Sequence, residues 1–457
     1  MSNGTLGLIR SACPGIAWPA VPSADAAQTL AFQFQLELSQ WYGPLELQAL
    51  QYRQLDILLK HACATVPYYR ERWSGVYDSA VPLTPERFSR LPLLTRGALQ
   101  QNFENLKSTA PLPQHGPPGE TRSSGSTGMP VRVMKTPLND LVWQAIMLRE
   151  HLWHGRDLAG KLAVIRRNVQ AREVAGWDAV IDAIAATGRT ALLSIDTEIA
   201  LQLAWLEEQQ SDYLLTYPSN VAELARLALK CGTRLPRLRE IMTIGEVVTP
   251  ALRDLCREAW GARVVDAYSA QEVGYLGLQC PGHEHYHVQA ECTLVEVLDT
   301  WGRPCAPGQA GLVVATPLHN FAMPLVRYVV GDYAEAGHPC PCGRGLPVLN
   351  RVMGRTRNTL LLETGERYWP SFGTHRFADI APIVQHQFVQ KSFGVIEARL
   401  VTVRPLTREE EQEFERHVQA RLPVPFELKL VYVREIPRAA SGKYEDFMSE
   451  IADAGAA

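Results

Sequence analysis

Apolar and polar residues follow two different periods through the middle of the chain, and the two periods alternate. Short apolar runs predict strands at residues 162–165, 213–217, 240–244 and 263–267. Between them, apolar residues recur every three or four positions and predict helices at residues 138–153, 221–230 and 250–260. Strands that alternate with helices form parallel sheets with crossover helices, so the pattern predicts an α/β fold. Ligands in such sheets bind at the carboxyl ends of the strands.

The two ends of the chain carry different patterns. Residues 47–60 have helical spacing and predict an amphipathic helix that ends before Val66. Apolar runs with glycine-containing turns predict a small barrel-like subdomain, with strands at residues 293–298, 310–315 and 325–330. A compact α+β pattern follows, with strands at residues 395–403 and 428–433 and a helix at 408–422. We therefore expect a loosely ordered segment 1–25, a large domain 26–354 and a small C-terminal domain 355–457.

Composition and charge narrow the class of protein. The 457 residues include 45 lysines and arginines against 48 aspartates and glutamates, a net charge of −3. Bulk charge therefore favours a small-molecule partner and gives no indication of nucleic acid. Nine unevenly spread cysteines do not make a disulfide scaffold. With no apolar leader and no long apolar run, we expect a cytoplasmic protein without a membrane segment; a homodimer is left open.

One short stretch, residues 121–130, concentrates hydroxyl side chains and glycines. Glycines let successive backbone N–H groups converge on an anion, and hydroxyls add further donors. The candidate phosphate ligands are Ser123, Ser124, Gly125, Ser126, Thr127 and Gly128. A flexible linker is the alternative, but Pro130 and the β-like run 131–134 favour a turn between strands. The stretch is not a Walker loop, because no Lys-Ser/Thr pair follows the glycines.

The order Ser-Ser-Gly-Ser-Thr-Gly-Met-Pro resembles the phosphate loop of the adenylate-forming enzymes, the superfamily of acyl-CoA synthetases, adenylation domains and luciferases. Segments 66–72 and 91–96 resemble the phenylacetate-CoA ligase branch, which includes CapK-like and coenzyme F390 synthetase-like proteins. The resemblance covers residues 47–447. It implies a large multi-subdomain N-terminal domain and a mobile C-terminal lid that closes in two orientations.

The resemblance also assigns the adenine and magnesium ligands. Gly245 and Glu246, after a predicted strand, match the segment that borders adenine, although a plain turn would explain them as well. The run 266–274 matches the aromatic-x-x-x-Glu core. There Asp266 and Tyr268 would lie at the nucleotide, Ser269 would help hold the α-phosphate or carboxylate, and Glu272 would bind Mg²⁺. A solvated carboxylate is the alternative for Glu272.

Three further matches concern the ribose and the reacting centre. Asp332, in an Arg-Tyr-x-x-Gly-Asp run, would accept hydrogen bonds from the ribose hydroxyls, and Arg355 would approach ribose and phosphate. Lys443 matches the C-terminal lysine that reaches the acyl carboxylate and the α-phosphate, where a cation offsets developing charge. The alternative for Asp332 is a surface turn, and the alternative for Lys443 is a solvated lysine of the C-terminal tail. The chain departs from the family at 357–358, where Arg-Asn replaces the usual Asp-Asp of the hinge.

Cysteines and histidines gather at two places some 53 residues apart and indicate a structural zinc site. The first place is the segment 280–287 and the second is Cys340-Pro-Cys342. Tetrahedral Zn²⁺ takes four nitrogen or sulfur ligands, often two from each of two segments. We expect Cys280, His283, Cys340 and Cys342, with His287 as the alternative histidine; the cysteines could also simply be buried. Some phenylacetate-CoA ligase-like proteins carry a similar zinc.

Together these matches predict an AMP-forming acid–thiol ligase. It would activate a carboxylic acid with ATP and Mg²⁺, then pass the acyl group to coenzyme A with release of AMP and pyrophosphate. The acceptor could instead be an amine, a hydroxyl or a carrier-protein thiol. Adenylyl transfer to a cofactor and non-catalytic nucleotide binding also stay open. By analogy the acid is an aryl or arylacetic acid, for which Trp143, His151, Trp153, Trp177 and Tyr217 are candidate pocket residues.

Overall fold

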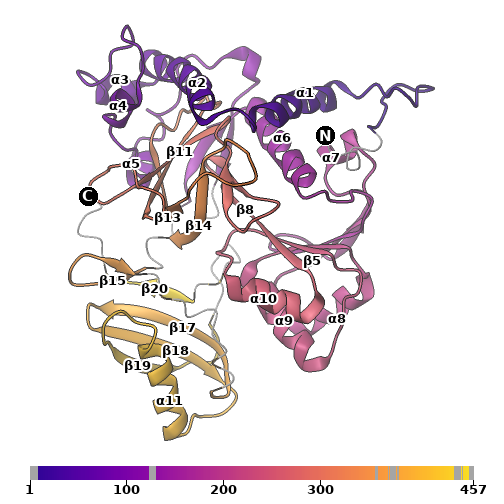
Figure 1. Cartoon of the computed structure of the whole chain (residues 1–457), viewed down its shortest axis with the longest axis vertical. Helices are drawn as coiled ribbons and strands as arrows, with labels where there is room; N and C mark the ends of the chain where they lie inside the picture. Colours follow the sequence, from indigo (N-terminus) through magenta and orange to yellow (C-terminus); the bar gives the residue numbers. More distant parts are fainter. Residues whose placement is uncertain are drawn as a thin grey trace.

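The computed structural model describes residues 9–122, 130–355, 359–368, 370, 377, 380–436, 444 and 446–451. Most strands of the large domain join one sheet with the order β11-β12-β13-β14-β10-β9-β8-β7-β6-β3-β5-β4 (Figure 1). A hairpin, β1-β2, precedes it in the chain, and a small pair, β15-β16, follows it.

The large domain contains these strands: β1 (Gly119–Arg122), β2 (Arg132–Lys135), β3 (Leu162–Arg166), β4 (Arg172–Val174), β5 (Thr190–Ser194), β6 (Tyr213–Thr216), β7 (Glu240–Thr243), β8 (Arg263–Ala270), β9 (Gly274–Gln279), β10 (Tyr286–Val288), β11 (Thr293–Leu298), β12 (Ala310–Pro317), β13 (Tyr328–Ala336) and β14 (Val348–Arg355). Its helices are α1 (Ala24–Ser39), α2 (Pro44–Thr65), α3 (Pro67–Arg72), α4 (Pro85–Ser89), α5 (Arg96–Gln101), α6 (Pro137–Trp153), α7 (Ala179–Ile184), α8 (Ile199–Gln209), α9 (Pro218–Cys231) and α10 (Pro250–Trp260), with a 3-10 turn at Pro113–His115.

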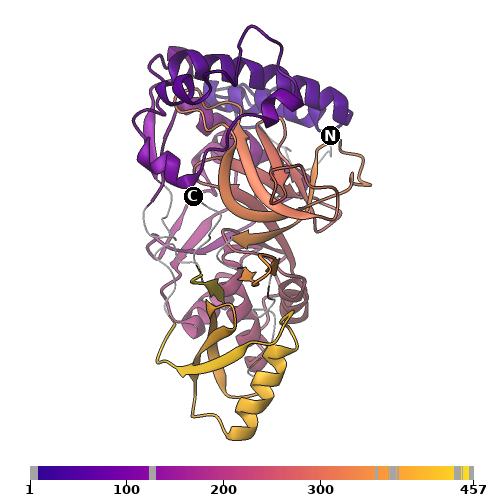
Figure 2. The same ribbon diagram turned by 90° about the vertical axis from the view of Figure 1, so that its left-hand side faces the viewer.

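Strand β8 joins a parallel half of the large sheet to an antiparallel half. Its first residues pair parallel with β7, where Asp266 lies opposite Thr243, and its last residues pair antiparallel with β9. The α/β prediction is confirmed. Among the described residues, the strands of the expected barrel-like subdomain belong to the same sheet as the parallel strands, because β8 pairs with β7 on one side and with β9 on the other. Figure 2 shows the curved strands of this subdomain in orange.

Helices α8, α9 and α10 cover one face of the parallel strands (Figure 1). The apolar faces of α9 and α10 bury Leu224, Ala228 and Cys256 against Ile241 of β7. Thr249 caps α10, because its hydroxyl accepts a hydrogen bond from the Leu252 N–H at 3.2 Å. These helices start directly after the strands' carboxyl ends, so their N-termini face the edge where ligands bind in this class of fold.

One buried arginine is among the residues that fasten the helical N-terminal region to the antiparallel half. Arg327 is buried, and its guanidinium forms a bidentate pair with Glu296 at 2.9 and 3.0 Å. It also donates to the carbonyl of Leu91 at 2.6 Å, while Leu94 forms a parallel bridge with Tyr328. Arg327 has a φ of 50°, so β13 begins at Tyr328, and the strand that we predicted from residue 325 starts three residues too early.

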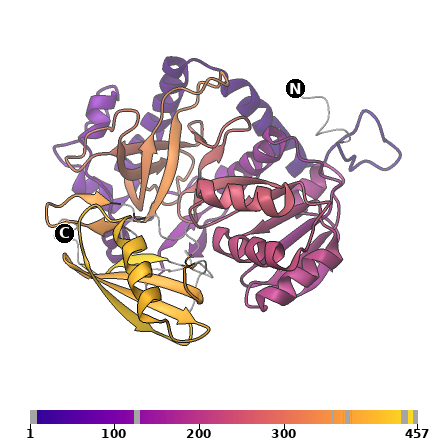
Figure 3. The same cartoon turned by 60° about the horizontal axis from the view of Figure 1, so that its bottom comes forward.

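The C-terminal part has its own sheet and its own core. Strands β17 (Ile383–Ser392), β18 (Val395–Thr402), β19 (Glu427–Tyr432) and β20 (Phe447–Ser449) have the order β19-β18-β17-β20, after β15 (Leu360–Leu361) and β16 (Arg367–Tyr368). Helix α11 (Arg408–Gln419) packs on one face, where Phe388, Phe414 and Phe447 form the core. Figure 3 shows this sheet and its helix, in yellow, as a body beside the large domain.

No helix among the described residues is long and apolar enough to cross a membrane.

Candidate active site

The loop after β7 is fixed to the N-terminus of α9. Gly245 has a φ of +79°, a left-handed conformation that favours glycine, and this turn places Glu246 above the edge of the sheet. The Glu246 carboxylate accepts hydrogen bonds from the Ser219 N–H at 2.8 Å and from the Ser219 hydroxyl at 3.1 Å. Because helix N-termini favour negative charge, this contact holds the predicted adenine segment in one orientation.

Two predicted residues of β8 occupy different environments. Asp266 is buried, and its carboxylate oxygens accept hydrogen bonds from the hydroxyls of Thr243 and Tyr286, both at 2.6 Å. Burial raises the pKa of Asp266 to about 6, although these two hydrogen bonds lower it. Both oxygens of Asp266 thus have an internal partner, and its predicted contact with the nucleotide stays a prediction. Ser269 is exposed near the end of the strand.

Tyr268, Asp332 and Arg355 come together from β8, β13 and β14. The Tyr268 hydroxyl donates to Asp332 Oδ2 at 2.9 Å, and Arg355 Nε lies 3.6 Å from Asp332 Oδ1. Asp332 and Arg355 are directly opposite in the β13–β14 pairing. Burial and the adjacent Asp332 charge raise the pKa of Tyr268 well above its usual value. The structure thus brings three predicted nucleotide residues into one group.

Glu272 lies in the turn between β8 and β9, close to this group. Its side chain is 5% exposed, and its Oε1 accepts a hydrogen bond from the Tyr328 hydroxyl at 3.1 Å. It is neither solvated nor at the start of a helix, so the interpretation as a solvated carboxylate is wrong. A nearly buried carboxylate suits a hard cation such as Mg²⁺, which takes oxygen ligands.

A narrow cleft extends from Glu272 along α6. Its apolar wall contains Trp143 and Tyr275, whose ring centroids lie 4.2 Å apart with an interplanar angle of 33°. At its polar end, the Lys135 ammonium donates to the carbonyl of Gln271 at 2.7 Å, and burial lowers the pKa of Lys135. Of the five aromatic candidates for an acid pocket, Trp143 lines this cleft.

The predicted phosphate loop, Ser123 to Gly128, lies outside the described residues, but its two flanks are described. Strands β1 and β2 pair antiparallel, with Arg122 opposite Arg132, so the loop connects two ordered strands. The interpretation of this stretch as an anion-binding turn stays a prediction. Strand β2 ends at Lys135, whose ammonium donates to the carbonyl of Gln271, the residue before Glu272, so the far end of the strand that follows the loop is close to the predicted magnesium ligand.

Lys443 and the departure at Arg357-Asn358 also lie outside the described residues. The residue after Lys443 is described. The Tyr444 N–H donates to Glu246 Oε1 at 2.7 Å, which brings the C-terminal domain into direct contact with the predicted adenine loop.

The cysteine and histidine cluster is formed by residues before and within β10 and by the connection between β13 and β14. Ligand atoms of Cys280, His285, His287 and Cys340 all lie within 4.8 Å of one another. Cys342 is also close, since its Sγ lies 3.4 Å from His287 Nε2. Within the described part of the chain, His285 Nε2 and His287 Nδ1 are buried without a hydrogen-bond partner, so each is available to a cation.

The donor set fits a zinc ion. Burial raises the pKa of Cys280, and it raises the pKa of Cys340 to about 12, so a cation is needed to hold these thiols as thiolates. Burial, followed by the nearby Arg344, lowers the pKa of His287 to about 3, which keeps its imidazole neutral. Two thiolates and two neutral imidazoles are a common zinc set. His283, the histidine that we preferred, is exposed and lies outside the cluster.

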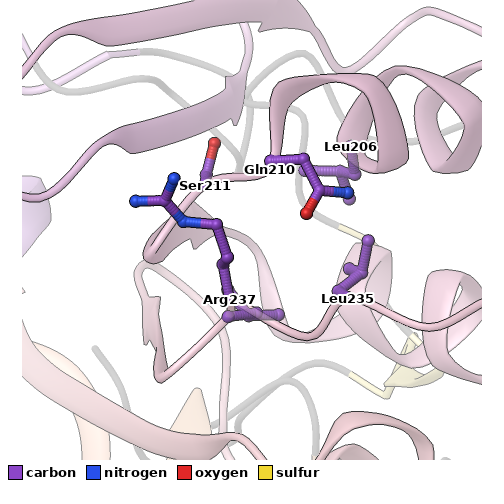
Figure 4. Close-up of a pocket in the computed structure, with 6 residues that line it drawn as sticks. Leu206, Gln210, Ser211, Leu235 and Arg237 are labelled. Atoms are coloured by element: carbon purple, nitrogen blue, oxygen red, sulfur yellow. The ribbon is translucent and has the colours of Figure 1, made fainter.

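The other pocket lies away from this site. Figure 4 shows Leu206, Gln210, Ser211, Leu235 and Arg237 around a space of about 220 Å³. These residues precede β6 and β7, at the amino ends of the parallel strands. Ligands of α/β sheets bind at the opposite edge, so we assign this pocket no role in the chemistry.

Sequence reasoning missed several contacts of the candidate site. Ser219 and Tyr328 support predicted residues, and Tyr444 contributes only a backbone N–H, which no side-chain pattern reveals. His285 and His287 are separated by two positions next to and within β10, a spacing that places both side chains on one face. That signal was present in the sequence.

Comparison with known proteins gives a consistent assignment. Residues 369–450 match the CapK C-terminal domain family. The phenylacetate-coenzyme A ligase of Thermus thermophilus is 27% identical over 390 residues, which cover 80% of this chain and 84% of that protein.

Solved structures agree with the fold. A 2-hydroxyisobutyryl-CoA ligase in the postadenylation state, with R3-HIB-AMP, has a TM-score of 0.69 at 18% identity and covers 90% of this chain and 91% of that one. The same ligase with 2-HIB-AMP and CoA in the thioesterification state has a TM-score of 0.58 at 19% identity, with the same coverage. The chain is thus similar to phenylacetate-coenzyme A ligases over most of its length, its residues 369–450 match the CapK C-terminal domain family, and it has the fold of acyl-CoA ligases.

Proposed function

We propose that this protein is an AMP-forming acyl-CoA ligase that activates a carboxylic acid with ATP. The observation that carries the proposal is the group formed by Tyr268, Asp332 and Arg355, with Glu272 in the adjacent turn. A carboxylate held between a tyrosine hydroxyl and an arginine is oriented to accept the two hydroxyls of a ribose. The homologous phenylacetate-coenzyme A ligases and the fold support the same chemistry.

In the first half-reaction, a carboxylate oxygen of the acid attacks the α-phosphorus of ATP, and the bond to pyrophosphate breaks. Asp332 and Arg355 position the ribose, and Tyr268 forms a wall beside the base. Ser123 to Gly128 hold the outer phosphates, and Ser269 and Lys443 act at the reacting carboxylate and α-phosphate. Glu272 would hold Mg²⁺, which supplies positive charge that neutralises the triphosphate.

In the second half-reaction, the thiolate of coenzyme A attacks the acyl carbon and AMP leaves, so the thioester forms without redox change. The chain supplies position and charge rather than a covalent nucleophile. Since no observation favours an amine, a hydroxyl or a carrier thiol as acceptor, we assign coenzyme A.

An aryl or arylacetic acid fits the cleft beside Glu272. Trp143 and Tyr275 offer ring faces along its apolar wall, and the charged end lies next to the predicted magnesium ligand. An acid bound with its ring against Trp143 would direct its carboxylate toward Glu272 and Lys135. A zinc ion in the cluster of Cys280, His285, His287 and Cys340 would be structural, since it lies apart from this cleft.

The direct test is ATP–pyrophosphate exchange with a panel of aromatic and aliphatic carboxylic acids, followed by product identification with coenzyme A. Exchange dependent on an aryl acid, and an acyl-CoA product, are expected. ATP binding without exchange for any acid would mean a non-catalytic nucleotide-binding protein. A product that retains AMP would mean adenylyl transfer to a cofactor, and either result overturns the proposal.

A further inference from the structure

We propose that the Glu246 carboxylate is a latch that holds the C-terminal domain in the orientation for adenylation. In this role Glu246 is a positioning residue, which acts on the reaction through the segment that contains Lys443. The inference rests on the proposed function, and it changes the role that the resemblance implied for Glu246, a contact to the adenine base.

The carboxylate is oriented before the domains meet. Its Oε2 accepts the Ser219 N–H at 2.8 Å, and its Oε1 accepts the Ser219 hydroxyl at 3.1 Å. Ser219 is the second residue of α9, where the helix dipole favours a negative charge. Both contacts lie within the large domain, so they fix Glu246 independently of the C-terminal domain.

The remaining capacity of Oε1 is used across the domain boundary. The Tyr444 N–H donates to Oε1 at 2.7 Å, from a position 198 residues further along the chain. A hydrogen bond from an N–H to a charged carboxylate is stronger than one between neutral groups. One carboxylate therefore joins the N-terminus of α9 to the C-terminal segment.

Tyr444 is also fastened to its own domain. Its hydroxyl donates to the carbonyl of His386 in β17, and the carbonyl of Asp446 accepts the Phe388 N–H at 2.8 Å. Tyr444 and Asp446 thus both contact β17 of the C-terminal sheet. A bond at Tyr444 therefore restrains the position of that sheet.

The position of Tyr444 in the sequence connects the latch to the reaction. Tyr444 directly follows Lys443, the predicted lysine of the adenylation step. The bond to Glu246 puts the neighbour of Lys443 against the predicted adenine loop, which is the placement that adenylation requires. A lid that serves both half-reactions must break the Glu246–Tyr444 bond to reach the second orientation, so the bond favours the first half-reaction.

Two substitutions at one position test the latch. Tyr444→Pro removes the N–H donor and the ring, whereas Tyr444→Ala removes the ring and keeps the N–H. Each variant is compared in pyrophosphate exchange and in single-turnover thioester formation from a synthetic acyl-adenylate and coenzyme A. Exchange should be about tenfold slower in the proline variant than in the alanine variant, since a hydrogen bond to a charged group is lost. Thioester formation should be equal in the two or faster in the proline variant.

Glu246→Gln, with Ser219→Ala as control, separates the latch from a role in binding the base. The latch predicts slower exchange for Glu246→Gln with nearly unchanged KM for ATP, while Ser219→Ala, which keeps the Tyr444 contact, loses less. A raised KM for ATP together with equal losses in both half-reactions would assign Glu246 to the base and overturn the latch. Equal exchange in Tyr444→Pro and Tyr444→Ala would do the same.

A distance measurement tests the latch without any activity. Spin labels at Leu201→Cys and Val403→Cys, both on exposed side chains of different domains, should report a broader interdomain distance distribution in Tyr444→Pro than in Tyr444→Ala. Identical distributions would contradict the latch. If the unsubstituted protein shows no exchange with any acid, the proposed function fails, and this measurement still decides whether the latch exists.

Discussion

The hydroxyl of Tyr268 donates a hydrogen bond of 2.9 Å to Asp332, a residue 64 positions later in the chain. This bond joins β8, where the parallel half of the sheet ends, to β13 in the antiparallel half. Arg355 approaches the other oxygen of the same carboxylate at 3.6 Å. Asp332 is therefore oriented from both sides before a nucleotide arrives, and less ordering is required when the ribose binds.

Substitution of Asp332 by asparagine should weaken ATP binding. The amide removes the charge and one acceptor from the proposed ribose site, so we expect KM for ATP to rise by roughly 10- to 100-fold, as the loss of a hydrogen bond to a charged group predicts. Steady-state kinetics with ATP as the varied substrate checks this. Asp254→Asn is the matched control, because Asp254 forms an exposed ion pair with Arg257 on α10. A KM equal to that of the control would remove Asp332 from the site.

Lys443→Ala should abolish most of the first half-reaction while leaving ATP affinity nearly intact. A cation that stabilises charge only in the transition state changes the rate and not ground-state binding, and we expect exchange to fall by about 10²- to 10³-fold. Calorimetry measures ATP binding in parallel. Lys429→Ala is the control, since Lys429 is an exposed lysine of β19 in the same domain. Equal exchange in Lys443→Ala and the unsubstituted protein would refute the assigned role.

The cysteine–histidine cluster should contain about one zinc ion per chain, as a closed four-ligand site predicts. Cys280→Ser and His287→Ala should each lose the metal and lower the melting temperature, because both side chains belong to the buried group. His283→Ala and Cys231→Ser should retain it, since both residues are exposed. Elemental analysis of the purified variants provides the measurement. A metal-free protein as isolated from zinc-containing medium would contradict the site.

Asp266 should make the stability of the large domain depend on pH. Burial raises its pKa from 3.8 to about 6, so the folded protein keeps a proton that the unfolded chain releases. The free energy of unfolding should therefore fall as pH rises from about 4 to about 6, and stay level above that. Asp266→Asn lacks this titration.

Urea denaturation at a series of pH values gives the difference in stability between the parent and Asp266→Asn. This difference should decrease across the stated window, whereas the difference for Asp254→Asn should show no such step. A level difference for Asp266→Asn would mean that the carboxyl titrates in the folded state as it does in the unfolded chain.

Sequence patterns predicted the bounds of helices and strands well where the hydrophobic period and the turn residues indicated the same bounds. The helix from Pro250 to Trp260 and the strand from Thr293 to Leu298 have the expected bounds, because periodicity and turn residues agree there. The start of β13 could not be predicted, since Arg327 adopts a left-handed conformation that is fixed by a tertiary ion pair with Glu296. The helix from Ala24 to Ser39 was not predicted. We expected a loosely ordered segment up to residue 25 and no helix before residue 47.

In the candidate site, too, motifs located individual residues, while their contacts depended on the tertiary fold. Motifs located Tyr268, Asp332 and Arg355, and the structure brings them together. The same motif placed Asp266 at the nucleotide, and that role stays a prediction. The sequence did not predict its hydrogen bonds with Thr243 and Tyr286, because these residues come from separate strands whose positions only the fold defines.

Strand β8 is hydrogen-bonded along its first half to β7 and along its second half to β9. A single-residue deletion between Val265 and Tyr268 would turn every later side chain of the strand to the opposite face. Neither neighbour could slide to compensate, because each is itself paired on its far side. We therefore expect insertions and deletions to be tolerated in exposed loops away from the site but not within the paired residues of β8.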